Sequence, residues 1–211
     1  MKFTLNYRGD LRASGSGSRL NDKWTIRRQI HSQLKELWQT HHVLRLLETD
    51  TILPAGGGRF QQFFVHHSFE LPQSELSGPT VNLIDPIEVV GKSFIPIVRE
   101  SMSLVCDLDI LFLRRGEPGQ LVSQGGDIDN RIKTLLDGLR MPESTDEIAN
   151  KRVSRPMYCL LENDSLITGL NVKTGPLLDH RQKSIHAVHL IIGVTVNAIH
   201  VLPYNMRLMG L

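Results

Sequence analysis

The chain has 211 residues, of which 40% are hydrophobic, 22% charged and 6% aromatic. This length supplies a sizeable core, so neither a disulfide nor a metal is needed to hold the fold together. Cys106 and Cys159 lack metal or redox spacing, and the longest apolar stretch, near residues 190–196, is too short to cross a bilayer. Disulfide-rich and membrane-spanning classes are excluded. Because the first residues show no signal-peptide pattern, we expect a cytoplasmic protein without a membrane partner.

The basic residues are concentrated near the N-terminus, although the formal net charge is only +2. Residues 1–48 contain nine Lys or Arg against four Asp or Glu, a balance of +5. Such a segment could contact phosphate groups, or it could be the solvated face of an ordinary helix. The charge pattern alone leaves both interpretations open.

The first half of the chain predicts a strand, a long helix and an irregular region. Alternation at residues 2–5 predicts a short strand, and a Gly/Ser-rich loop follows at residues 13–18. Apolar residues recurring every three or four positions predict a basic amphipathic helix over residues 22–48, with Asp22 as its N-cap. Five Pro and five Gly in residues 49–97 favour an irregular insertion with at most short strands.

The second half predicts the core of the fold. A helix with one apolar face is expected at residues 129–140. Strands are expected at residues 103–114, 157–161, 166–172 and 185–199. Because strands and helices do not alternate regularly, we predict an α+β fold with a mixed β-sheet and packed helices. We expect a single domain over residues 1–211, with its motif-bearing core at about residues 103–200.

The residues that could carry chemistry gather where the second helix begins. Asp127 and Asp129 are two apart and project to the same side of an extended backbone. Lys133 follows Asp129 by one helical turn on the same face. Carboxylates this close repel each other unless a cation binds between them, and oxygen ligands suit Mg²⁺ or Mn²⁺. The alternative is an Asp N-cap with an ordinary Asp–Lys pair, which accounts for neither Asp127 nor Asn130.

At this point the sequence resembles the RusA-like Holliday junction resolvase family, a crossover junction endodeoxyribonuclease family. The matching pattern is Asp127-x-Asp129-Asn130-x-x-Lys133-x-x-Leu136-Asp137-x-Leu139, then Asn163-Asp164-Ser165-x-Ile167 and Lys173. The resemblance covers about residues 127–173 and the strand that begins at Ser103. It implies a RusA-like fold, here with an enlarged N-terminal half, and a homodimer that acts on branched DNA, Holliday junctions in particular.

The resemblance also implies a role for each matching residue. By position, Asp127, Asp129 and Asp164 are the metal-binding and catalytic carboxylates, Lys133 is the catalytic lysine and Asn130 is an orienting neighbour. The implied reaction is Mg²⁺-dependent hydrolysis of a phosphodiester bond, in which the ion activates water. The lysine stabilises the transition state or helps to position the nucleophile. Mn²⁺ is the expected substitute for Mg²⁺.

The expected DNA contacts come from the basic helix, the Gly/Ser loop and the last strand of the motif. They are Arg12, Arg19, Lys23, Arg27, Arg28 and Lys173. One departure concerns the usual acidic pair of the family, which is Asn163-Asp164 in this chain. Three other functions stay open. The first is a DNA-binding or regulatory relative with weak or no activity, and the second is a nucleotidyltransferase, which also uses an Asp-x-Asp pair and a distant third Asp. The third is a purely structural phage or defence-system protein.

Overall fold

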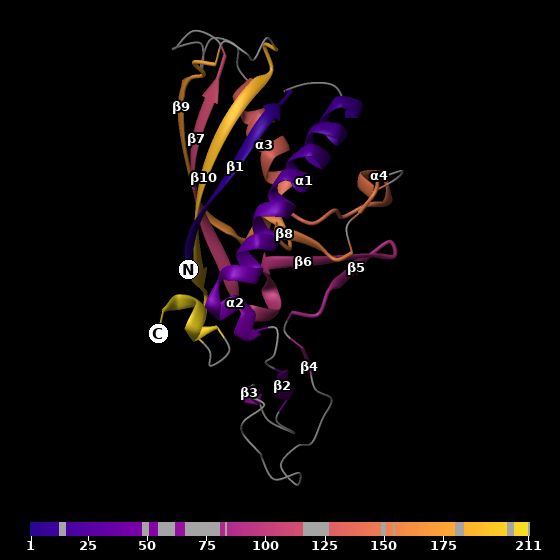
Figure 1. Cartoon of the computed structure of the whole chain (residues 1–211), viewed down its shortest axis with the longest axis vertical. Coiled ribbons are helices and arrows are strands. Elements are labelled where there is room, and N and C mark those ends of the chain that lie inside the picture. The colour runs from indigo at the N-terminus through magenta and orange to yellow at the C-terminus, as the bar shows by residue number, and fades with distance from the viewer. Residues whose placement is uncertain are drawn as a thin grey trace.

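The computed structural model is α+β, which confirms the fold class predicted from the sequence. Helices pack beside the larger of two mixed sheets (Figure 1). The structure describes residues 1–12, 16–47, 51–54, 62–65, 81–82, 84–115, 127–148, 151–153, 155–179, 184–201 and 205–210. None of the helices in these ranges is long and apolar enough to cross a membrane.

The elements follow the predicted order from strand to helix to core strands. The helices are α1 (Ser16–Thr40), α2 (His42–Leu47), α3 (Asp127–Leu139) and α4 (Thr145–Ile148), with 3₁₀ turns η2 (Glu100–Met102), η3 (Asp164–Leu166) and η4 (Met206–Met209). The strands are β1 (Lys2–Asp10), β2 (Thr51–Pro54), β3 (Gln62–Val65), β4 (Val81–Asn82), β5 (Ile87–Val89), β6 (Lys92–Val98), β7 (Leu104–Arg114), β8 (Met157–Leu161), β9 (Ile167–Pro176) and β10 (Ala187–Ala198). The predicted strands of the second half are therefore confirmed as β7, β8, β9 and β10, and the predicted helix as α3.

The larger sheet has the strand order β1-β10-β7-β9. The first two pairings are antiparallel and the pairing of β7 with β9 is parallel, so the sheet is mixed. Side chains of a strand alternate between the two faces of its sheet. In β7 the even-numbered residues Leu108, Ile110 and Phe112 are buried, whereas the odd-numbered Asp109 and Leu111 are exposed. One face of this sheet therefore belongs to the core.

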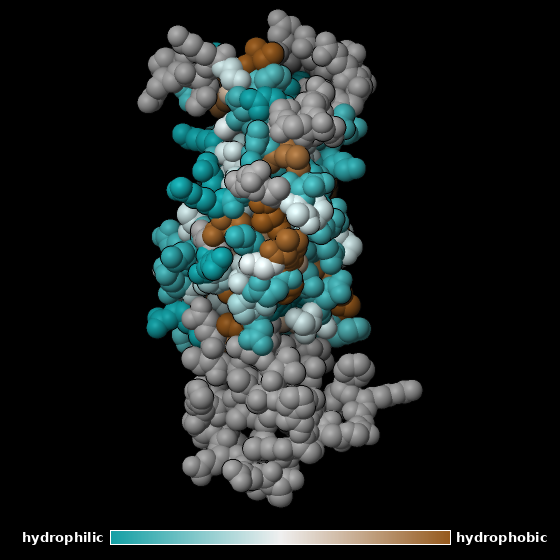
Figure 2. All heavy atoms as spheres, turned by 90° about the vertical axis from the view of Figure 1, so that its right-hand side faces the viewer, coloured by the Kyte–Doolittle hydropathy of each residue, from teal (hydrophilic) through white to brown (hydrophobic). Residues whose placement is uncertain are grey.

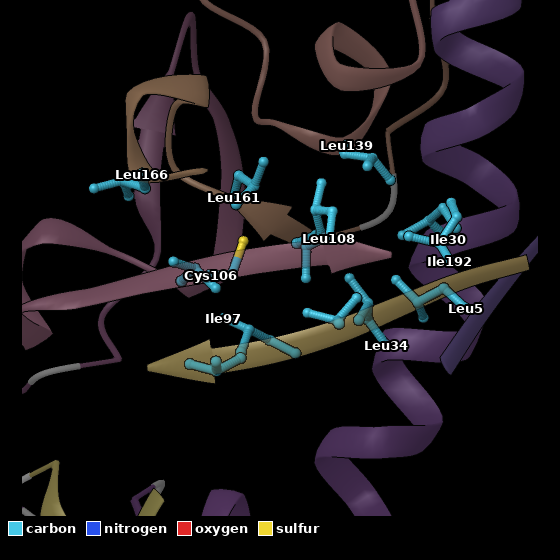
Figure 3. Close-up of a cluster of buried hydrophobic side chains, with 14 of the residues drawn as sticks. Leu5, Ile30, Leu34, Ile97, Cys106, Leu108, Leu139, Leu161, Leu166 and Ile192 are labelled. Carbon is cyan, nitrogen blue, oxygen red and sulfur yellow. The ribbon is translucent and has the colours of Figure 1, made fainter. Parts of the chain in front are cut away.

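Helix α1 covers that inner face. Ile26, Ile30 and Leu34 recur along one side of the helix and are almost completely buried. They share one cluster with buried side chains of β1, β7 and β10, among them Leu5 and Ile192 (Figure 3). Burying a side chain of this size contributes about 1.5–3 kcal/mol. The side of the molecule that Figure 2 shows is mostly hydrophilic over its described residues.

Two glutamines of α1 form hydrogen bonds with the outer edge of β1, which no strand of the described residues covers. The Gln33 side-chain amide accepts a hydrogen bond from the backbone N–H of Asn6 (2.9 Å) and donates one to its carbonyl (2.7 Å). Gln29, one helical turn earlier, makes the same two bonds with Arg8 (3.1 and 2.8 Å). The helix thus supplies the partners that a neighbouring strand would supply, and it fixes its own position along the sheet.

The long helix differs from its prediction at both ends. It begins at Ser16 and ends at Thr40, and α2 is a separate short helix, whereas one helix was expected over residues 22–48. Asp22 is therefore not an N-cap. It lies within α1, and its buried carboxylate accepts hydrogen bonds from the backbone N–H (2.9 Å) and the guanidinium (2.7 Å) of Arg12. Burial raises the pKa of Asp22.

The region expected to be an irregular insertion contributes one strand to the core. Strands β2, β3 and β4 are short, as predicted, but β6 is largely buried and pairs with both β5 and β8. Pro96 made this segment a poor candidate for a central strand. The structure accommodates it because β5 pairs with β6 only as far as Phe94, so among the described strands none pairs with Pro96 on that side.

Candidate active site

A cavity of about 650 Å³ opens between α3 and β9. Its walls are formed by Ile128, Asp129, Ile132, Lys133, Leu136, Asp164, Leu170, Val172 and Thr174. Three residues that the sequence assigned to one site, Asp129, Lys133 and Asp164, therefore line the same cavity although α3 and η3 are separate elements. The remaining lining is almost entirely aliphatic.

Asp129 and Lys133 lie one turn apart on the exposed side of α3. Leu135 and Leu139 occupy the other side of the helix and are buried, so the apolar periodicity orients the two charged residues outward. Within the described part of the chain, neither charged side chain makes a hydrogen bond or an ion pair. The ordinary Asp–Lys pair that could have explained this spacing is therefore not formed.

Asp127 is the first residue of α3, and its side chain lies outside the described residues. Helix α3 therefore begins two residues before Asp129, so Asp129 is not the N-cap, and the extended backbone expected over residues 127–129 is not formed. Asn130 is exposed, and its backbone carbonyl accepts a hydrogen bond from the Thr134 hydroxyl (2.9 Å). The expected roles of Asp127 as a ligand and of Asn130 as an orienting residue remain predictions.

Asp164 opens η3, the turn that leads into β9. Asn163 caps this turn: its side-chain oxygen accepts hydrogen bonds from the backbone N–H of Ser165 (3.0 Å) and from its hydroxyl, and its amide donates to Glu100 (3.1 Å). Leu166 is buried in the core and anchors the turn. Asn163 is thus committed to local structure, whereas the Asp164 carboxylate is exposed and borders the cavity.

A cluster of ion pairs, most of them buried, holds the C-terminal half of α3. The Arg27 guanidinium donates to Glu147 (2.6 Å) and to the backbone carbonyls of Asp137 (2.7 Å) and Arg140 (3.1 Å). Lys23 lies 2.7 Å from the Asp137 carboxylate. The cluster joins α1, α3 and α4, and fixes α3 relative to the sheet.

This cluster corrects two expected DNA contacts. Arg27 is only 2% exposed, and the partners named above occupy its guanidinium. Lys23 is largely buried, and its ammonium pairs with Asp137 and, at 3.7 Å, with Glu147. Both residues stabilise the fold and are not presented to a DNA backbone. Arg28, the residue after Arg27, is exposed and stays a candidate for contact with DNA.

The remaining expected contacts differ in accessibility. Arg12 pairs with Asp22 (2.7 Å) and with Asp10 (3.3 Å), so its guanidinium already binds two carboxylates of the protein although the side chain is partly exposed. The side chain of Arg19 lies outside the described residues. Lys173 is exposed, but it alternates with Val172 and Thr174 along β9 and therefore projects from the opposite face of the sheet. It does not face the cavity.

The carboxylates at the cavity have the right chemistry for a hard divalent cation. Asp129 and Asp164 offer exposed oxygen ligands of the kind that Mg²⁺ and Mn²⁺ prefer. Among the described side chains, no group of three His, Cys, Asp or Glu is placed to hold a metal ion. The third expected ligand, Asp127, is outside that set. Asp129 and Asp164 are the two expected ligands whose side chains the structure describes, and both line the cavity.

The aliphatic walls of the cavity were not predicted as part of the site. Ile128, Ile132 and Leu136 follow each other at intervals of four on α3, and Leu170 and Val172 alternate on β9. Each pattern is visible in the sequence, but it indicates only an apolar side of an element. That the two sides face each other depends on the packing of α3 against the sheet.

Comparison with protein-family models, with curated proteins and with solved structures gives no match for this chain. The features that bear on function are therefore the motif at the start of α3 and the residues that line the cavity.

Proposed function

We propose that this chain is a Mg²⁺-dependent, structure-selective endodeoxyribonuclease that hydrolyses phosphodiester bonds in branched DNA, with Holliday junctions as the expected substrate. The observation that supports the proposal is the shared cavity of Asp129, Lys133 and Asp164. These three positions match the motif of the RusA-like resolvases. A homodimer would suit this substrate, because two symmetric cuts need two sites related by a two-fold axis.

The chain's own residues would divide the work between them. Asp129 and Asp164, with Asp127, would hold the divalent ion, which supplies Lewis-acid activation of water and phosphate when it is bound. Lys133 lines the same cavity as Asp129 and Asp164, and its ammonium group makes no hydrogen bond or ion pair with a described residue. It would donate hydrogen bonds to the phosphate and offset the negative charge that grows in the transition state.

Precise positioning is the second requirement, and the buried face of α3 supplies it. Both Asp129 and Lys133 are on this one helix, so their separation is set by the helical turn. The ion-pair cluster around Arg27 and the tight contact of Gly138 with α1 hold the helix itself. Rigid support of this kind is what a reacting constellation needs.

The second candidate is a DNA-binding relative without activity. The observation that favours it is Asn163, which stands where the family has a carboxylate and is engaged in capping η3. The two candidates differ in a single measurable step, the hydrolysis itself.

The deciding experiment incubates the protein with mobile and fixed four-way junctions and with linear duplex, in Mg²⁺ and in EDTA. The wild type should cut only branched DNA and only with Mg²⁺, and Asp129→Asn should bind junctions without cutting them. Asp109→Asn is the matched control, because Asp109 lies on the outer face of the sheet, bonded to Asn171 (2.8 Å). Binding without cutting by the wild type would favour the second candidate, and incorporation of labelled nucleotides would indicate a nucleotidyltransferase.

A further inference from the structure

The proposed chemistry accounts for only one end of the cavity. A divalent ion and a phosphate group need oxygen ligands and hydrogen-bond donors, which Asp129, Lys133 and Asp164 provide. The rest of the wall is aliphatic and comprises Ile128, Ile132, Leu136, Leu170 and Val172, with Thr174 as the one further polar residue. These side chains would contribute nothing to an ion or to a phosphate.

The aliphatic walls form a slot with two sides. Ile128, Ile132 and Leu136 form a ridge on α3, because residues four apart lie above one another on a helix. Leu170 and Val172 form the facing wall, because alternate residues of β9 project to one face of the sheet. Leu170 remains 46% exposed, so this wall is accessible from solvent. The volume of about 650 Å³ falls within the range of ~300–1,000 Å³ found for sites that bind small organic groups.

A ligand that fits both ends must join an anionic group to a flat, weakly polar one. Carboxylates that hold a cation, together with an ammonium, attract phosphate, whereas facing aliphatic walls favour the face of a ring. A nucleotide has this combination, but inside a duplex its base is stacked and paired. At a branch point the base is already partly unstacked, so removing it from its neighbours requires less free energy than in a duplex. Aliphatic contact with the ring face also makes no distinction between bases.

We infer that the aliphatic slot between α3 and β9 receives one unstacked base of branched DNA, next to the phosphate that Lys133 contacts. The inference rests on the proposed function, since it places the DNA at the same cavity. It assigns a role in selecting branched over linear DNA to Leu170 and its neighbours in the slot. Thr174 would be the one slot residue that can form a hydrogen bond to the edge of that base.

The test uses two exposed leucines on neighbouring strands. Leu170 is 46% exposed and lines the slot, whereas Leu111 is 38% exposed and lies in register with Lys173 on the outer face of the sheet. Serine at either position removes similar apolar area, so Leu111→Ser is the matched control for Leu170→Ser. The melting temperatures of both variants are measured, and Leu170→Gln replaces the serine variant should that variant not fold.

The probe is a four-way junction carrying 2-aminopurine at successive positions around the branch. It is mixed with protein in Ca²⁺ in place of Mg²⁺, so that a divalent ion can bind to the carboxylates while the DNA remains uncut. The wild type and Leu111→Ser should raise the fluorescence severalfold at one position beside the branch, and Leu170→Ser should lose most of this rise. No rise at any position with the wild type, or an equal rise with Leu170→Ser, would overturn the inference. Cutting in Mg²⁺ is scored separately. If the protein cuts the junction without the rise in fluorescence, only the inference about the slot is rejected. If it gives the rise without cutting, only the proposed nuclease activity is rejected.

Discussion

Gly138 of α3 lies so close to Ile26 of α1 that a Cβ atom on the glycine would be 2.9 Å from three carbon atoms of the isoleucine. Real Cβ contacts are essentially never this short, so the absence of a side chain at this position sets the distance between the two helices. Asp129 and Lys133 are on the same helix as Gly138. The packing of α3 on α1 therefore also places the candidate catalytic residues against β9.

We predict that Gly138→Ala destabilises the protein. In an exposed helix interior the change would stabilise by about 1 kcal/mol, because alanine has the higher helix propensity. Here the added methyl group overpacks a buried contact, which costs about 1–3 kcal/mol, so we expect a small net loss in the free energy of unfolding. Urea denaturation measures it. Ile26→Val in the same chain should recover part of the loss, and a stabilised Gly138→Ala protein would contradict the proposed packing.

The Lys133 side chain should matter for chemistry and not for folding. Because it is exposed and has no partner among the described residues, Lys133→Ala should leave the unfolding free energy within about 0.5 kcal/mol of the wild type. Removing the charge that we propose to face the phosphate should slow junction cutting by about 10²–10³-fold. Single-turnover cleavage measures the chemical step.

The matched control for this prediction is Lys173→Ala, which removes an exposed ammonium group from the outer face of the same sheet. At saturating protein its single-turnover cutting rate should stay close to that of the wild type, because a DNA contact outside the cavity affects binding and not the chemical step. Equal effects of the two substitutions would mean that Lys133 acts only through general charge and not at the cavity.

Adjacent arginines of α1 should respond in opposite ways. Arg27 is buried, and removing its guanidinium takes away the shortest ion pair of Glu147 and two hydrogen bonds to backbone carbonyls, although Lys23 and Arg140 still pair with Glu147. Arg27→Ala should therefore destabilise the protein by about 3–5 kcal/mol. Arg28→Ala should change stability by no more than about 0.5 kcal/mol, but it should weaken DNA binding and reduce the dependence of binding on salt concentration. Thermal denaturation and binding titrations at several salt concentrations separate these effects.

Lys23 and Arg27 show how far the charge pattern of a sequence can be interpreted. Helical periodicity places Lys23 and Arg27 on the polar side of α1, and so predicted exposure. Their acidic partners, Asp137 and Glu147, lie more than one hundred residues further along the chain, where no local pattern connects them to α1. A basic helix face and one half of a buried ion-pair cluster therefore look alike in the sequence.

Predictability of the fold follows the same division between local and distant information. The alternation of β7 and β10 and the apolar spacing of α3 are local, and all three elements were predicted. Strand β6 was missed because it lies in the region whose Pro and Gly content favours irregular structure, and its Pro96 fits a strand only because β5 pairs no further than Phe94. At the site, helix phase alone brings Asp129 and Lys133 together. The sequence suggested the position of Asp164 only through the family resemblance, and the slot depends on packing that no local pattern shows.

The stability of the protein should also depend on the protonation of His31. Its Nδ1 accepts a hydrogen bond from the backbone N–H of Tyr158 (2.9 Å), and the two rings stack with their centroids 5.8 Å apart. This bond joins α1 to β8 and requires the neutral ring, since a protonated Nδ1 is a donor. Burial, with a smaller contribution from Lys35, lowers the pKa of His31 in the folded protein.

The direction of the pH effect follows from that shift. Above a pH of about 6.5, the usual pKa of histidine, the ring is neutral in both folded and unfolded chains and the contribution of this site is complete. Below this pH the unfolded chain binds a proton that the folded chain resists, so stability falls as the pH decreases towards the lowered pKa. Urea denaturation between pH 8 and pH 5 should therefore show a steeper loss for the wild type than for His31→Asn. Parallel pH profiles for the two proteins would show that the bond to Tyr158 does not depend on the ionisation of this ring.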